Sequence, residues 1–142
     1  MNKVEIFELL NSNPAFHLAT VEGNQPRVRG MLLYKADEDG IVFHTALSKD
    51  LYTQVINNSK AELCFNNGGT QVRVTGELEI VEDRDLKDKI RNHPSRIFMK
   101  PWLESGQVKD FYKEIIVFRL KEGTAVIWTL DKNFDKKVII QL

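Results

Sequence analysis

The sequence has little cysteine and no recognisable metal motif. Cys64 is the only cysteine among 142 residues, so a disulfide within the chain is impossible and a zinc site built on several thiolates is excluded. Cys64 lies in an apolar stretch and is predicted to be an inert buried thiol. The three histidines, His17, His44 and His93, lack the spacing of a metal site. We therefore expect no metal centre.

Long apolar runs and a surplus of charge are also missing. No run approaches the roughly 20 apolar residues that cross a bilayer, and residues 1–20 lack the organisation of a signal peptide. Twenty Lys and Arg residues balance twenty Asp and Glu residues, so the chain has no general attraction for nucleic acid or anionic membranes. We expect a cytoplasmic protein that binds neither, and that holds any anion locally.

Several catalytic signatures are absent. There is no Gly-x-x-x-x-Gly-Lys phosphate loop, no catalytic triad and no pair of carboxylates at a recognisable spacing. These absences argue against a nucleoside triphosphatase and leave the catalytic residues unassigned. The length of 142 residues and the 42% hydrophobic content fit a single globular domain over residues 1–142.

The spacing of apolar and turn residues predicts an α+β fold. Strands are predicted over residues 16–21, 27–35, 41–45, 61–66, 71–81, 115–120 and 124–130, and the last two are expected to form a hairpin. Helices are predicted over residues 4–10, 48–57 and 82–92. Residues 94–112 fit neither pattern. Six or seven mostly antiparallel strands with peripheral helices favour a sheet that closes into a small barrel.

Two arginines stand one residue apart in the second predicted strand. The period of two places Arg27 and Arg29 on the same face. Guanidiniums offer donors to phosphate and a flat surface for stacking, and Gly30 leaves room for a ligand to approach the backbone. This strand is predicted to form a site for an anionic or planar ligand.

A second stretch, residues 43–49, runs from a strand end into a predicted helix. Free backbone N–H groups and the helix dipole attract phosphate there, and Thr45, Ser48 and Lys49 add hydroxyls and an ammonium. With Arg27, these residues carry enough positive charge for a phosphate dianion. The alternative is that Ser48 merely caps the helix and that Lys49 is solvated.

Three motifs in order, Gln-Pro-Arg-Val-Arg-Gly-Met, Phe-His-Thr-x-x-Ser-Lys-Asp-Leu-Tyr and Gln-Val-Arg-Val-Thr-Gly, resemble the FMN-binding split-barrel family typified by pyridoxamine 5′-phosphate oxidase-related proteins. The resemblance covers residues 16 to 81. It implies a split β-barrel, a homodimer with FMN in grooves at the subunit interface, and a small-molecule substrate.

The resemblance assigns cofactor-binding roles to eleven residues. Those matching the segment at the phosphate and flavin ring are Arg27, Arg29, Gly30 and Met31. Those matching the phosphate end are Thr45, Ser48 and Lys49. Those expected near the ring are Gln71 and Arg73, with Trp102 or Trp128 as an aromatic contact from the partner chain. By default, a tryptophan in such a domain belongs to the core or an interface. Arg29 is the candidate to stabilise negative charge on reduced flavin.

The chain departs from the true pyridoxamine phosphate oxidases at residues 136–142, which lack their C-terminal Arg-x-His element. The vitamin substrate is therefore not expected. The chain looks closer to small relatives of uncertain substrate, some associated with reduction of nitro compounds. His44 is expected to be structural rather than catalytic.

Three functional hypotheses follow. The first is an FMN-dependent oxidoreductase that takes electrons from a donor such as a reduced pyridine nucleotide. The second is a flavin-, deazaflavin- or haem-binding protein of the same fold that performs no turnover. The third is a structural dimer with a vestigial groove.

Overall fold

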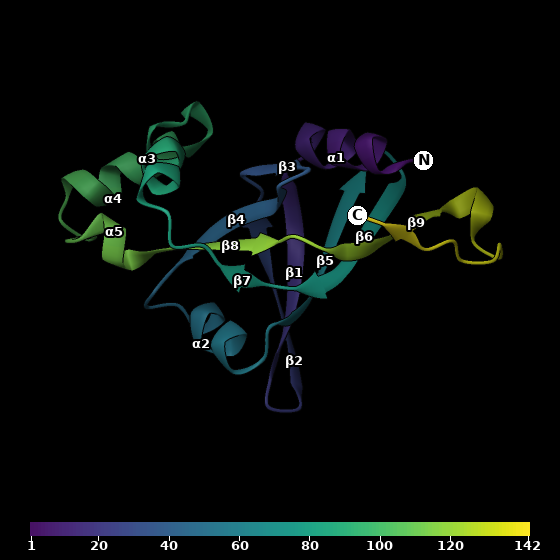
Figure 1. The fold of residues 1–142 in the computed structure, drawn as a ribbon, viewed down its shortest axis with the longest axis horizontal. Coiled ribbons are helices and arrows are strands. Elements are labelled where there is room, and N and C mark those ends of the chain that lie inside the picture. The colour runs from purple at the N-terminus through teal and green to yellow at the C-terminus, as the bar shows by residue number, and fades with distance from the viewer.

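The computed structural model describes all 142 residues and contains two antiparallel β-sheets with helices around them (Figure 1). One sheet has six strands in the order β10-β9-β6-β5-β1-β2, with the bounds β1 (Ala15–Glu22), β2 (Gln25–Leu32), β5 (Lys60–Asn67), β6 (Thr70–Glu77), β9 (Gly123–Thr129) and β10 (Ile140–Gln141). The other has four in the order β3-β4-β8-β7, with the bounds β3 (Lys35–Asp37), β4 (Gly40–Ala46), β7 (Glu79–Ile80) and β8 (Ile115–Leu120). The predicted α+β class with mostly antiparallel strands is confirmed.

The helices lie at the periphery. Their bounds are α1 (Lys3–Ser12), α2 (Asp50–Asn57), α3 (Arg84–Asn92), α4 (Lys100–Glu104) and α5 (Phe111–Glu114), with 3₁₀ turns η1 (Pro94–Met99) and η2 (Leu130–Lys132). The stretch 94–112, which fitted no pattern, thus forms short helices, and α3, α4 and α5 gather at one end of the molecule (Figure 1). None of the helices is long and apolar enough to span a bilayer.

Two predicted strands are each broken where the chain changes sheet. The predicted strand 27–35 ends as β2 in the six-stranded sheet and resumes as β3 in the other, and 71–81 divides likewise into β6 and β7. Leu33 and Leu78, at the two breaks, are both buried. Apolar residues therefore continue through each break while the neighbouring strand changes. The spacing of apolar residues predicts burial and does not predict which strand is the hydrogen-bond partner.

The predicted hairpin of the last two strands is wrong. β8 pairs with β4 and β7, whereas β9 pairs with β6 and β10. The chain crosses between the sheets at Gly123, where an added Cβ would lie 2.7 Å from both the Leu120 side chain and the Thr75 carbonyl oxygen. Only glycine fits this close crossing.

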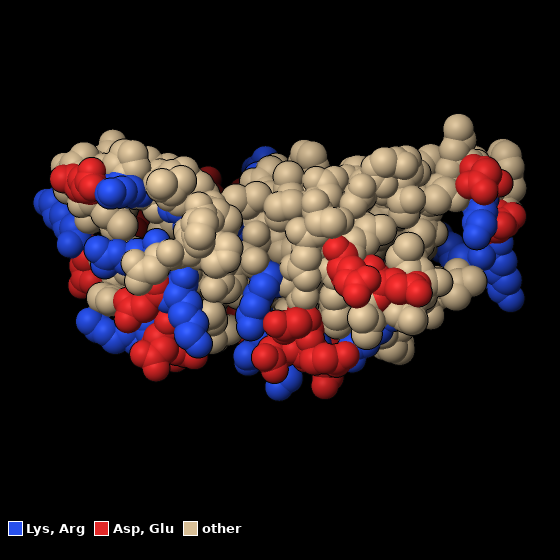
Figure 2. Space-filling view, turned by 90° about the horizontal axis from the view of Figure 1, so that it is seen from above, with Lys and Arg blue, Asp and Glu red and all other residues tan.

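The core lies between the sheets and includes residues of α1 and α2. Burial alternates along β1, β5 and β6, so that one face of the six-stranded sheet is apolar. Phe16 joins the two sheets, because its ring stacks on Phe65 at 4.7 Å and meets Phe43 edge-on at 5.2 Å. On the face shown in Figure 2, basic and acidic side chains are interspersed, as the balanced composition predicts.

Candidate functional site

The candidate site is built on β2, an edge strand that pairs only with β1. The N–H of Leu33 donates to the carbonyl of Pro14 at 2.8 Å, and antiparallel pairing alternates from there. The N–H and C=O groups of Gly30 and Leu32 therefore point away from β1. The carbonyl of Leu32 accepts from Arg96 Nη2 at 3.1 Å, which agrees with this direction. At Gly30 an added Cβ meets nothing within 4 Å either, so the sheet face beside these backbone groups is also open.

A polar groove of about 660 Å³ runs along this strand. Six predicted site residues line it: Arg27, Arg29, Gly30, Met31, Thr45 and Lys49. Two carboxylates, Glu22 and Asp50, line it as well. Three cationic side chains against two acids leave a surplus of one positive charge, which suits an anionic ligand.

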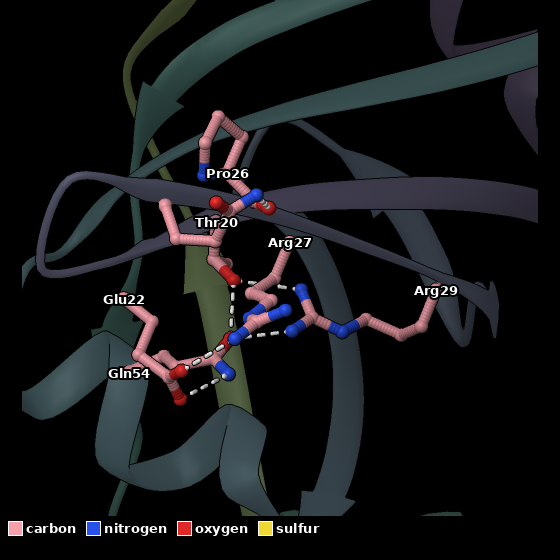
Figure 3. Close-up of polar contacts among 7 residues, drawn as sticks. Thr20, Glu22, Pro26, Arg27, Arg29 and Gln54 are labelled. Carbon is pink, nitrogen blue, oxygen red and sulfur yellow. Dashed lines mark hydrogen bonds and ion pairs between the residues drawn. The ribbon is translucent and has the colours of Figure 1, made fainter.

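The two arginines are held in one hydrogen-bond network (Figure 3). Arg29 donates to Thr20 Oγ1 at 2.7 Å and also to Gln54 Oε1. The hydroxyl of Thr20 donates to the same amide oxygen at 2.6 Å. Gln54 Nε2 donates to Glu22, whose other carboxylate oxygen lies 2.9 Å from Arg27 Nη2. The network ties α2 to the β1–β2 hairpin and fixes the direction of both guanidiniums.

Charge in the groove follows from these contacts. The hydrogen bond from Arg27, followed by that from Gln54, lowers the pKa of Glu22. Burial, followed by the charge of Arg27, lowers the pKa of Arg29, which still leaves an arginine charged at neutral pH. Lys49 forms no ion pair in the chain and is exposed. Its ammonium is therefore free to meet a ligand.

Ser48 lies differently from expectation. The N-cap position of α2 is Lys49 and no side chain caps the helix, so Ser48 lies one residue before the N-cap, and the alternative that Ser48 itself caps the helix is wrong. The hydroxyl of Ser48 instead donates to Glu114 Oε1 at 2.6 Å, and Ser48 is not among the residues that line the groove. The first amides of α2, which lack intrahelical acceptors, stay uncapped by side chains beside Lys49.

An apolar cavity of about 300 Å³ opens on the same backbone. The apolar wall of the cavity is formed by η1, α4, α5 and the start of β8. Its residues include Phe98, Met99, Trp102, Leu103, Phe111 and Ile115. Trp102 is 46% exposed and packs edge-on against Phe98. Four residues line both the groove and the cavity: Gly30, Met31, Thr45 and Lys49.

Trp102 thus lies beside Gly30 and Met31 of its own chain, whereas the prediction placed such an aromatic contact on a partner chain. The other three predicted residues, Gln71, Arg73 and Trp128, lie on the opposite face of the six-stranded sheet from the arginines. Within one chain they cannot share a ligand with the polar groove. Arg73 Nε is buried without an acceptor, and Trp128 Nε1 donates to Asn133 at 2.8 Å.

Sequence reasoning missed several residues of this region. Thr20 and Gln54 are ordinary polar residues 34 positions apart, and no local pattern predicts their contact. His44 was expected to be structural, yet it lines the apolar cavity. Arg96 lies in the stretch 94–112, for which the sequence predicted no secondary structure, and no sequence pattern indicated a role for it. Cys64, predicted to be buried, is only half-buried.

Comparisons with known proteins agree on one family. A family model described as pyridoxamine 5′-phosphate oxidase matches residues 3–127. A pyridoxine/pyridoxamine 5′-phosphate oxidase from Shewanella woodyi is 29% identical over 128 residues, which cover 88% of this chain and 60% of that enzyme. This chain therefore spans less than two thirds of its relative's length.

Solved structures show the same fold. A NimC/NimA-family protein from Clostridium acetobutylicum has a TM-score of 0.71 at 23% identity, covering 98% of this chain and 92% of that one. A pyridoxamine 5′-phosphate oxidase-related, FMN-binding protein from Nostoc punctiforme has a TM-score of 0.58 at 16% identity, covering 99% and 96%. The predicted split-barrel architecture is confirmed.

Proposed function

Because the chain belongs to the pyridoxamine 5′-phosphate oxidase family, we propose that it binds FMN along the free edge of β2 and acts as an oxidoreductase on a small molecule. One observation carries the proposal: the open backbone at Gly30 lies between a cationic groove and an apolar cavity. FMN has a phosphate at one end and a flat ring with polar edges at the other. The cationic groove suits the phosphate and the outward backbone groups of Gly30 suit the polar edge of the ring, which leaves the apolar cavity beside them for a second molecule.

The residues present fit the cofactor. Arg27, Lys49 and the uncapped first turn of α2 would hold the phosphate. The outward N–H and C=O groups of Gly30 would meet the polar edge of the ring, because such edge groups need partners. Arg29, fixed by Thr20 and Gln54, supplies a positive charge that needs no rearrangement when negative charge develops nearby.

Bound FMN would supply the electron or hydride transfer itself. The protein's part is then to bind, to orient and to keep a fixed charge beside the cofactor. This division of labour accounts for a chain in which no nucleophile and base form a pair, and no catalytic residue is assigned.

We also propose that the active form is a homodimer. Gln71, Arg73 and Trp128 face away from the groove of their own chain, so a second copy is needed to bring them to a cofactor. The side chain of Arg73 is half-buried and forms no ion pair within the chain, so its guanidinium charge is available to a partner on that face.

The proposal is tested on protein purified without added cofactor. A flavin absorption spectrum is expected, and mass spectrometry of the released pigment should give FMN rather than FAD, a deazaflavin or haem. Anaerobic addition of NADH or NADPH should then bleach the flavin. Colourless protein that does not bind added FMN would contradict the cofactor assignment. Bound FMN that no pyridine nucleotide reduces would instead favour a binding protein without turnover.

A further inference from the structure

Arg96 is the largest fully buried side chain, with 1% of its surface exposed. No carboxylate accompanies it, because none of the ion pairs in the chain includes Arg96. Its Nε donates to His44 Nε2 at 2.8 Å, and its Nη atoms donate to Ser95 Oγ at 2.9 Å and to the Leu32 carbonyl at 3.1 Å. A buried cation surrounded by neutral acceptors is unusual and fixes the groups around it.

The contact with Arg96 determines the protonation of His44. An arginine Nε–H can only donate, so His44 Nε2 must be the acceptor and the ring proton must sit on Nδ1. A second proton on Nε2 would break the bond and place two cations side by side. Burial and the charge of Arg96 accordingly lower the pKa of His44 to about 4. At neutral pH His44 is an uncharged ring with one donor.

That donor has no partner. Nδ1 of His44 forms no hydrogen bond in the chain, whereas Nε2 is engaged, and His44 lines the apolar cavity beside Gly30. Among the other polar side chains of the wall, Glu114 already accepts from Ser48, and the Thr45 hydroxyl can either donate or accept. Lys49, which the cavity shares with the polar groove, is also restricted to donating, but it is charged and exposed. His44 is therefore the one uncharged side chain of the wall that can only donate, so it selects for an acceptor.

We propose that the apolar cavity is the substrate site and that it takes a small uncharged aromatic molecule carrying a hydrogen-bond acceptor such as a carbonyl oxygen. His44 Nδ1–H donates to this acceptor, and Arg96 is the positioning residue for His44. The inference rests on the proposed FMN site for its role in turnover, because the cavity and the groove share Gly30 and Met31. An uncharged ring is favoured because a charged group would lose its hydration in an apolar wall. The volume of about 300 Å³ suits a single ring.

The test uses two probes of one shape, acetophenone with a carbonyl oxygen and ethylbenzene without it. Binding is followed by the indole N–H signals in NMR spectra of the purified protein. Trp102 lines the cavity and should shift, while Trp128, on the opposite sheet face, is an internal control. Acetophenone should bind roughly three- to tenfold more tightly than ethylbenzene, the range expected for one neutral hydrogen bond. Equal affinities, or no shift of Trp102, would overturn the proposal.

Two variants separate the hydrogen bond from a structural role. His44→Met keeps a weak acceptor, the thioether sulfur, near Arg96 and has no donor, so the preference for acetophenone should vanish although the protein stays folded. Arg96→Met should leave both tautomers of His44 populated, which imidazole ¹⁵N shifts report directly. Retained preference in His44→Met, or an unchanged tautomer in Arg96→Met, would contradict the roles assigned.

FMN titration keeps this inference distinguishable from the proposed function. FMN should bind wild type and His44→Met equally, and acetophenone should bind to the wild type in its presence. If FMN binds but displaces acetophenone, the cavity holds the ring and the substrate inference fails while the cofactor proposal stands. If acetophenone binds with the expected preference and FMN does not bind at all, the cavity assignment survives and the proposed function fails.

Discussion

Arg27 Nη2 lies 2.9 Å from Glu22 Oε1 across the β1–β2 hairpin, so the arginine predicted to bind phosphate is already paired with a carboxylate. Any phosphate in the groove competes with Glu22 for the same guanidinium. Both side chains are half exposed, and solvent screens ion pairs of this kind so that they contribute little. The competition is therefore weak enough for a dianion to overcome.

Removing this competitor should tighten cofactor binding. Glu22→Gln is expected to lower the dissociation constant for FMN by about two- to fivefold, because Arg27 no longer has to leave a carboxylate. Quenching of FMN fluorescence on titration gives the constant. Glu79→Gln breaks a comparable exposed pair with Arg119, 2.7 Å apart and outside the residues that line the groove, and should change nothing. An unchanged or weaker affinity in Glu22→Gln would show that the phosphate does not reach Arg27.

Lys49 should act on the phosphate alone. Lys49→Gln is expected to weaken FMN binding about tenfold through loss of one charge-assisted contact, and to leave the affinity for riboflavin, which lacks the phosphate, unchanged. Isothermal titration with both ligands measures this. Lys121→Gln, an exposed lysine between β8 and β9, is the matched control. Equal losses of affinity for FMN and riboflavin would show that Lys49 does not contact the phosphate.

Gly30 and Gly76 make opposite predictions. Gly30 has open space around its Cβ position, which lies on the sheet face of His17 and Cys64, and its N–H points away from β1. Gly30→Pro removes this N–H without breaking a β1–β2 hydrogen bond, so it should fold and yet bind FMN about three- to tenfold more weakly, because the edge loses one donor. At Gly76 an added Cβ would meet the Leu120 side chain at 2.9 Å. Gly76→Ala should therefore lower stability by roughly 1–3 kcal/mol with little effect on the affinity of the protein that remains folded. Thermal scans and FMN titrations of both variants decide the matter, and normal FMN binding by Gly30→Pro would exclude the outward N–H of Gly30 as a contact of the cofactor.

The buried ring of His44 predicts a pH dependence of stability. Its pKa is about 4 in the folded protein against 6.5 for the ordinary side chain, so between these values the unfolded chain binds more protons. The stabilisation is fully present above about pH 6.5 and is lost as the pH falls toward 4, with a slope of at most about 1.4 kcal/mol per pH unit. Urea unfolding at several pH values should show this slope in wild type and a shallower one in His44→Gln. Identical slopes would mean that His44 is accessible and titrates normally.

Arg73 predicts the oligomeric state. Its half-buried side chain forms no ion pair within the chain and lies on the sheet face that would meet a second copy in the proposed dimer. Arg73→Gln should raise the dissociation constant of the dimer about tenfold or more, as measured by sedimentation over a range of concentrations. Lys121→Gln serves as control here too. A wild-type chain that is monomeric at high micromolar concentration would refute the homodimer.

Much of the site was readable from short patterns in the sequence. The alternation over 25–32 places Arg27 and Arg29 on one face, and the strand-to-helix junction after His44 supplies Thr45 and Lys49; the structure brings four of these residues, Arg27, Arg29, Thr45 and Lys49, to one groove. Local geometry suffices here, because the backbone conformation that the sequence pattern predicts also sets the directions of side chains that are two to four residues apart.

Other features depended on contacts between distant segments. The strands break at Leu33 and Leu78, and β8 separates from β9, because the chain passes from one sheet to the other at these points. Ser48 likewise forms its hydrogen bond with Glu114, a residue 66 positions away in the sequence. Apolar periodicity records which side chains are buried and not which strand lies next to them.

The sequence by itself determined an α+β domain and a strand that carries two arginines and a glycine at which a ligand can approach the backbone. Apolar periodicity, charge and glycine placement are local properties of the sequence. Only the tertiary structure decided that β2 is an edge, that Gln71, Arg73 and Trp128 face away from the groove, and that Arg96 is buried against His44. These relations depend on how segments far apart in the chain pack, since a buried arginine reads in sequence like any solvated one.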